Sequence, residues 1–200
     1  DGSEPFLFYM CGSVIWGYFS ICVINTSNTF ISNSQIFSKV YFPRLIVPIS
    51  TIIISLVQFL IQFILLLVFM LYFYSKGANI SFNYNIYLLP LLLFHVALLS
   101  FGFGILISSI TTKYKDLKYV LSFGIQLWMF ATPIVYPLSI VPKEYLWLAI
   151  LNPMAPIVEM FRSIIISSNE INFSHYSLSF SITLIIVILG MLSFSKIEKT

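Results

Sequence analysis

Charge is what this sequence of 200 residues most lacks, since only 8% of them are Asp, Glu, Lys or Arg while 59% are hydrophobic. The mean hydropathy is +0.98. So few charged side chains cannot cover the surface of a water-soluble protein of this size, which excludes a soluble globular domain. The composition therefore predicts an integral membrane protein.

The residue patterns of catalysis and ion coupling are also missing. The hydrophobic runs contain no Asp or Glu that could hold a coupling ion, as proton- or sodium-driven carriers require. No nucleotide-binding GxxxxGK[ST] pattern occurs. The side chains that could serve a hydrolase are scattered without a recognisable spacing: His95, His175, Asp116 and Glu159. We therefore expect no enzymatic activity, no metal and no bound cofactor.

What the sequence does contain is a series of hydrophobic runs of bilayer length. About 20 apolar residues, at about 1.5 Å each, cross the hydrocarbon core of a membrane. Five runs meet this condition: 6–25, 48–74, 87–110, 118–136 and 178–194. The acidic opening "DGSEP" is unlike the basic start of a signal peptide, so the first run is predicted to be a span. Both ends of this sequence are expected to lie within a longer chain.

The basic residues predict the orientation of these spans, because Lys and Arg are retained on the cytoplasmic side. If the first span runs inward, seven basic residues lie inside: Lys39, Arg44, Lys113, Lys115, Lys118, Lys196 and Lys199. Only Lys76, Lys143 and Arg162 then lie outside. The N-terminus of this chain is therefore predicted outside and the C-terminus in the cytosol.

Polar residues inside the spans predict how the helices pack. Thr51, Ser55, Gln58 and Gln62 recur on one helix face, as an interhelical hydrogen-bond seam or as a polar strip beside a translocation path. Ser100, Gly104 and Ser108 form a ladder of small residues that permits close helix approach. His95 is predicted to make an interhelical hydrogen bond, with a proton-relay role as the alternative.

Prolines divide the outer region 133–156 into pieces too short to cross a membrane, because proline breaks helices. The segments 143–151 and 156–166 are nevertheless strongly apolar, which suits a re-entrant or interfacial helical hairpin. Glu159 and Arg162 stand three residues apart and are expected to form a surface ion pair, with a gate contact as the alternative.

A short amphipathic helix is predicted just before the second span. Its apolar residues lie at helical spacing between Ser32 and Phe42, Pro43 ends it, and Arg44 anchors at the headgroups. Either it lies on the membrane surface, or it is a coupling helix that a soluble partner pushes.

Three blocks of sequence, in this order, resemble the permease subunit of ABC-2 type exporters that move lipid-linked polysaccharides. They are "NSQIFSKVYFPRLIVPIS", "TTKYKDL" and "QLWMFATPIVYPLSIVPKEYLWLAILNPMAPIVEMFR". The resemblance implies an all-α polytopic membrane protein in which residues 1–200 form a single but partial ABC-2 type domain. The family has six spans per subunit, so an interface helix and a first span would be missing here.

The resemblance also implies roles for individual residues. The residues expected to couple to the ATPase are Asn33, Ser34, Ile36, Phe37, Lys39, Tyr41, Pro43, Arg44, Lys113, Lys115 and Asp116. Those of the channel are Phe123, Gln126, Trp128, Phe130 and Tyr136, whose aromatic faces suit sliding sugars. Those of the outer gate are Pro133, Pro137, Asn152, Pro153, Glu159 and Arg162. Trp128 and Tyr136 could instead be packing or interfacial aromatics.

The function implied is that of a transporter subunit in the inner (plasma) membrane of a bacterium, which exports lipid-linked polysaccharide of the O-antigen, capsule or teichoic acid type. It would work as a homodimer with two ATP-binding cassette subunits, and these partners would use the ATP and Mg. Two alternatives stay open: export of a lipid or drug by the same scaffold, and a non-transport membrane scaffold.

Overall fold

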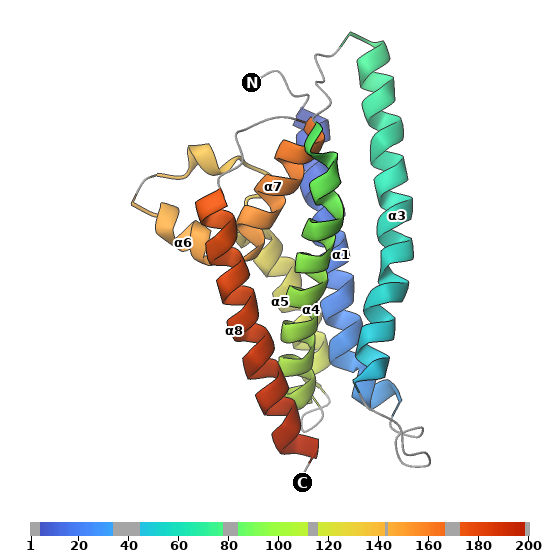
Figure 1. Cartoon of the computed structure of the whole chain (residues 1–200), viewed down its shortest axis with the longest axis vertical. Coiled ribbons are helices and arrows are strands. Elements are labelled where there is room, and N and C mark those ends of the chain that lie inside the picture. Colours follow the sequence, from blue (N-terminus) through green and yellow to red (C-terminus); the bar gives the residue numbers. More distant parts are fainter. Residues whose placement is uncertain are drawn as a thin grey trace.

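The chain is a bundle of α-helices whose long axes run roughly together (Figure 1). The computed structural model describes residues 5–33, 45–77, 84–111, 116–142, 144–166 and 173–198, and these contain no strand. The helices are α1 (Pro5–Ser32), α3 (Ile46–Ser75), α4 (Leu89–Thr111), α5 (Leu117–Ala131), α6 (Leu146–Leu151), α7 (Met154–Ile166) and α8 (Phe173–Glu198). Two 3-10 turns, η1 (Tyr84–Leu88) and η2 (Leu138–Ile140), complete the set. The predicted all-α class is confirmed.

Four helical segments in the described part of the chain are long and apolar enough to cross a membrane. They are Pro5–Thr29, Ile46–Ser75, Asn85–Thr111 and Phe173–Lys196. The fifth predicted span, 118–136, is shorter than expected, because α5 ends at Ala131 and Thr132 is extended. The residue before a proline is driven out of the helical region, and Pro133 follows Thr132. At about 1.5 Å per residue, α5 is about 22 Å long and falls short of the hydrocarbon core.

α4 lies at the centre and packs against α1 on one side and α8 on the other (Figure 1). The predicted ladder Ser100, Gly104 and Ser108 is buried, as expected for a packing face. A Cβ added at Gly104 would lie 2.4 Å from Cβ of Thr26, so only glycine lets α1 approach this closely. Towards α8, a Cβ at Gly190 would lie 2.8 Å from the carbonyl oxygen of Gly102.

Two of the four predicted polar residues of α3, Ser55 and Gln62, lie against α1. Ser55 is buried and donates to the carbonyl of Thr51 in its own helix. Gln62 reaches α1, where its Oε1 lies 2.9 Å from the position that a Cβ on Gly17 would take. Gln58, by contrast, is exposed. The stripe thus meets α1 only in part, and the hydroxyls of Thr51 and Ser55 donate within α3 rather than across helices as the seam interpretation predicts.

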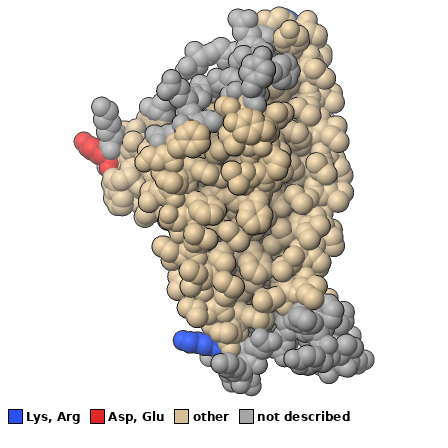
Figure 2. Space-filling model, viewed as in Figure 1, with Lys and Arg blue, Asp and Glu red and all other residues tan. Residues whose placement is uncertain are grey.

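The two segments predicted to contact cytosolic partners, 34–44 and 112–115, follow helices that end at the same end of the bundle. Thr111 at the end of α4 donates to the carbonyl of Ser27 near the end of α1, at 3.2 Å. The start of α3 and the end of α8 lie at this same end, while α6 and α7 lie towards the opposite one (Figure 1). Figure 2 shows a face almost without charge between the two ends.

Candidate functional site

Arg162 is the centre of a buried polar cluster towards the end of the bundle where α6 and α7 lie. It is only 2% exposed, although it is the charged side chain predicted to lie on a helix surface. Its Nε donates to the carbonyl of Phe8 at 3.2 Å, and its Nη1 donates to that of Pro133 at 2.7 Å. Its Nη2 donates to the carbonyl of Ile134. The planar guanidinium thus joins α7 to α1 and to the turn that follows α5.

Small and aromatic residues of α1 make room for this cation. The guanidinium lies over the ring of Phe8, with its carbon 3.7 Å from the ring centroid. A Cβ on Gly12 would lie 2.7 Å from Nη2 of Arg162, so a side chain there would displace it. Burial lowers the pKa of Arg162 to about 10, which still leaves it charged at neutral pH. A buried charge of this kind is stable only with full hydrogen bonding.

The predicted ion pair between Glu159 and Arg162 is not what the structure contains. Arg162 points inward and uses the carbonyls of Phe8, Pro133 and Ile134, because α7 is buried on almost all sides. Glu159 is the half-buried exception on α7, and burial raises the pKa of its carboxyl. The charge of Arg162 lowers that pKa more weakly. The two residues therefore interact at a distance rather than as a surface pair.

Asn152 holds the start of α7. Its Oδ1 accepts from the backbone N–H of Met154 at 3.1 Å, which is the hydrogen bond of a helix N-cap. Its Nδ2 donates to Oγ1 of Thr132 at 2.9 Å, at the end of α5. The next residue, Pro153, accepts at its carbonyl from Oγ of Ser179 in α8, at 2.6 Å.

The structure therefore brings together four of the predicted outer-gate residues: Pro133, Asn152, Pro153 and Arg162. We call these four residues, with Phe8, Thr132, Ile134 and Ser179, the outer cluster. Pro137 lies outside it, at the start of η2. The partners Phe8 and Ile134 carried no sequence signal, because they contribute main-chain carbonyls that every residue possesses.

The predicted channel residues divide into two groups. Phe123 and Phe130 are 61% and 70% exposed on the outer face of α5, and Gln126 is exposed beside them. Trp128 points inward instead, with its ring centroid 5.3 Å from that of Phe19 and 5.0 Å from that of Phe103. Tyr136 lies beyond the end of the helix and is half-buried. We call the exposed residues Phe123, Gln126, Leu127 and Phe130 the α5 face.

Most of the predicted coupling residues lie outside the described part of the chain. These are Ser34, Ile36, Phe37, Lys39, Tyr41, Pro43, Arg44, Lys113 and Lys115. Asn33 closes α1, where its Nδ2 donates to the carbonyl of Thr29 at 2.9 Å. Asp116 is exposed immediately before α5.

His95 makes the interhelical contact that its position predicted. Its Nε2 lies 2.8 Å from Oγ1 of Thr183, which joins α4 to α8. The rings of Tyr176 and Phe180 stand edge-on to the imidazole at 5.1 and 5.2 Å. Within the described residues, no group of three His, Cys, Asp or Glu could hold a metal ion.

Comparisons with known proteins agree with this architecture. The family model of the ABC-2 type transporter matches residues 5–166. Two O-antigen export system permease proteins RfbA from Klebsiella pneumoniae are each 27% identical over 192 residues, which cover 96% of this chain and 72% of theirs. One from Myxococcus xanthus is 26% identical over 163 residues, or 80% of this chain and 60% of its own. Since the family match extends over most of its length, this chain belongs to the ABC-2 type transporter family.

Proposed function

We propose that this chain is the membrane-spanning permease subunit of an ATP-driven exporter of lipid-linked polysaccharide of the O-antigen kind. The observation that carries the proposal is the likeness to O-antigen export permeases over 96% of the chain. That length includes α5 and the outer cluster as well as the segment 33–44. A separate ATP-binding cassette subunit supplies the energy, and the functional unit is a homodimer with two such partners.

The α5 face is the part of the chain best suited to the polysaccharide. Phe123, Leu127 and Phe130 are spaced by four and three residues, which places them on one side of the helix. Aromatic rings offer apolar contact to the C–H faces of sugars without fixing a hydrogen-bond register. Two copies of the chain that face one another across α5 would enclose a path between them.

The coupling step acts at the opposite end of the bundle from the outer cluster. Residues 34–44 lie between α1 and α3 in the sequence, and Pro48 is buried in the first turn of α3. In the proposed cycle, ATP binding closes the cassette subunits, which displace this segment and tilt α3. The segment 112–115 makes the second contact. Both lie in the cytosol, with the N-terminal end of α1 outside.

A replacement experiment tests the coupling step. Residues 34–42 are exchanged for a Gly/Ser linker of equal length, and ATP hydrolysis is measured in vesicles that also hold the cassette subunits. We expect the permease-dependent stimulation of hydrolysis to disappear while membrane insertion is retained. The same exchange at 78–83, on the predicted outer side, serves as the control and should leave stimulation unchanged. Normal stimulation with the 34–42 linker would refute the coupling role.

The cargo is tested separately in a strain that lacks this gene. We expect lipid-linked polymer to accumulate on the cytosolic face of the membrane, and a plasmid copy of the gene to clear it. Polymer that reaches the outer surface normally in the absence of the gene would contradict polysaccharide export.

A further inference from the structure

Arg162 has a second possible acceptor on its own helix. Glu159 precedes it by three residues on α7, and side chains at this spacing are neighbours on one face of a helix. The two charges act on one another, while the guanidinium itself donates to the carbonyls of Phe8, Pro133 and Ile134. The same cation thus has two sets of partners to choose from, one on α1 and the turn after α5, the other on α7.

The first set is complete only while α1 lies against the turn after α5. Phe8 of α1 contributes both a carbonyl and a ring to the guanidinium. A methyl carbon of Ile134 lies 3.0 Å from the position that a Cβ on Gly12 would take, so this side chain packs on α1 beside the cation. Gly12 and Ile134 are both buried. A separation of α1 from the turn would therefore remove the carbonyl and the ring together.

α1 is the helix through which the cytosolic end of the bundle can act on this contact. It has 28 residues and, at about 1.5 Å per residue, is about 42 Å long. Phe8 stands in its first turn, and the segment 34–44 follows its last turn in the sequence. A displacement of that segment therefore acts on one end of α1, and Arg162 holds the other end.

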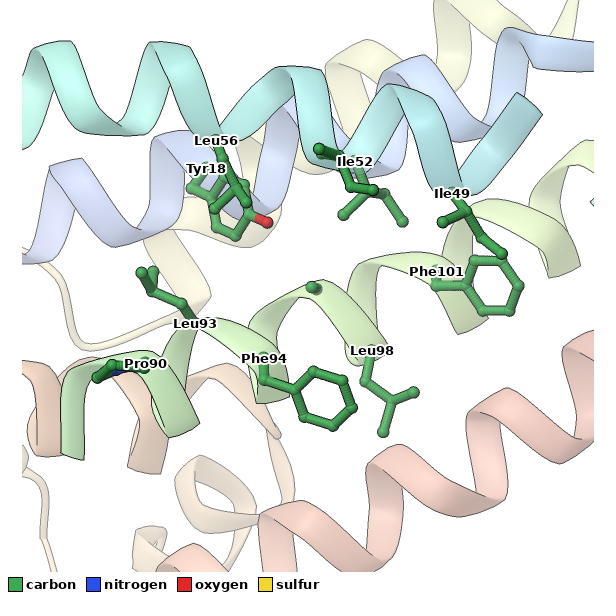
Figure 3. Close-up of a pocket in the computed structure, with 11 residues that line it drawn as sticks. Tyr18, Ile49, Ile52, Leu56, Pro90, Leu93, Phe94, Leu98 and Phe101 are labelled. Atoms are coloured by element: carbon green, nitrogen blue, oxygen red, sulfur yellow. The ribbon is translucent and has the colours of Figure 1, made fainter. Parts of the chain in front are cut away.

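α3 is fixed to α1 more firmly than to α4. The ring of Phe6 on α1 lies 5.3 Å from that of Phe69 on α3, and the ring of Tyr18 lies 5.5 Å from that of Phe59. Towards α4, by contrast, an apolar groove lies between the two helices (Figure 3). A tilt of α3 is therefore expected to carry α1 with it.

We propose that Arg162 and Glu159 form a two-position switch of the outer cluster, an inference that rests on the ATP-driven movement in the proposed function. In the first position, which the structure shows, the guanidinium holds α7 and the turn after α5 against α1. When α1 tilts away, the guanidinium turns to the Glu159 carboxylate, and the carbonyls of Pro133 and Ile134 are released to water. The carboxylate is needed because a buried charge left without a partner is strongly unfavourable.

The variant Ile134→Cys reports the separation of α1 from the turn after α5. It keeps the main-chain carbonyl that Arg162 uses, and the native Cys11 and Cys22 are replaced by alanine in the same chain. Labelling by a water-soluble maleimide is measured in lipid nanodiscs that also hold the cassette subunits. The side chain at 134 is buried in the structure, so labelling should be slow without ATP and rise when ATP is added.

Two substitutions should change this labelling in opposite directions. Glu159→Gln should reduce the ATP-dependent labelling about tenfold or more, because the guanidinium then has no charged acceptor to turn to. Glu144→Gln, at an exposed carboxyl before α6, is its control and should label like the parent. Gly12→Ala should give labelling without ATP, because its methyl group would displace Nη2 of the cation. Gly17→Ala, which meets the amide of Gln62 instead, is its control.

The labelling and the export of polymer are judged separately. Equal ATP-dependent labelling in the parent and in Glu159→Gln would overturn the switch, and so would a parent that ATP does not change. Labelling of Gly12→Ala without ATP that is no greater than that of Gly17→Ala would also overturn it. None of these results refutes polysaccharide export, which the deletion strain tests. Labelling that depends on ATP and on Glu159, beside normal export in the deletion strain, would support the switch and refute the proposed cargo.

Discussion

Two short apolar helices of this chain, α5 and α7, have opposite surroundings. Of the 13 residues of α7 all are buried except Glu159, whereas of the 15 residues of α5 only Ile125 is buried. α7 finds its packing partners within this chain, chiefly α1 and α8. Most of α5 finds none among the described residues. The contrast teaches that α7 stabilises the subunit, while α5 presents a surface to something outside it.

The largest expected effect is at the polar centre of α7. Arg162→Met keeps the length of the side chain but removes the donor to the carbonyls of Pro133 and Ile134 and a second donor to that of Phe8. Each unsatisfied buried group costs about 1–3 kcal/mol, so we expect a loss of about 3–5 kcal/mol in the free energy of unfolding. Denaturant unfolding of the detergent-solubilised chain measures it. Lys76→Met, at an exposed cation, is the control, and an equal loss in both variants would contradict the role of Arg162.

The second prediction compares two glycines. Gly104→Ala pushes a methyl group into Thr26 between α4 and α1, and such overpacking costs about 1–3 kcal/mol. Gly124→Ala adds the same methyl group to α5, where a Cβ meets nothing within 4 Å. It should be neutral or stabilising by up to about 1 kcal/mol, because alanine favours the helix. Chemical denaturation of both variants under one condition is the measurement. Similar destabilisation by the two would show that α5 packs as tightly as α4.

The third prediction concerns the α5 face. Replacing both Phe123 and Phe130 with alanine should change the free energy of unfolding by less than about 1 kcal/mol, because both side chains are exposed. Export of polysaccharide to the cell surface should fall severalfold. The pair Ile61→Ala and Ile64→Ala on the exposed side of α3 should leave export unchanged. Normal export without the two rings would remove the α5 face from the transport path.

The smallest effect is expected at Glu159. Burial raises the pKa of this carboxyl, so in the folded state it holds its proton more tightly than in the unfolded state. The resulting stabilisation is fully present below the pKa of the carboxyl in the unfolded state. It is lost as the pH rises through the pKa of the carboxyl in the folded state. Glu159→Gln should therefore raise the melting temperature at pH 8 relative to the parent chain, with little change at pH 4. The opposite pH dependence would mean that the charge of Arg162, rather than burial, dominates the pKa of the Glu159 carboxyl.

The sequence was sufficient for features that rest on local pattern. The ladder Ser100, Gly104 and Ser108 predicted a tight helix contact, and the prolines predicted two short helices, because both rules act along one chain segment. The end of α5 was misjudged, although Thr132 before Pro133 is a recognisable stop signal.

The outer cluster could not be assembled in the same way. Arg162 donates to main-chain carbonyls, and does not pair with Glu159, because of how α1, α5 and α7 pack. The spacing of side chains in the sequence does not encode this packing. The predicted channel residues divide into an exposed and an inward-facing group for a similar reason. Trp128 and Phe130 differ by two positions, which is enough to place them on different sides of a helix.

Cysteine cross-linking of α5 in membranes tests the central claim most directly. Phe123, Leu127 and Phe130 are replaced by cysteine one at a time, and the native Cys11 and Cys22 are buried. When no polysaccharide lies between them the two α5 faces should close on one another, so oxidation should then join two copies of the chain from at least one of these positions. A disulfide requires Cα atoms within about 7 Å. Ile64→Cys on α3 should give no linked dimer. Dimers from Ile64 with none from α5 would contradict a transport path formed where two copies meet across α5.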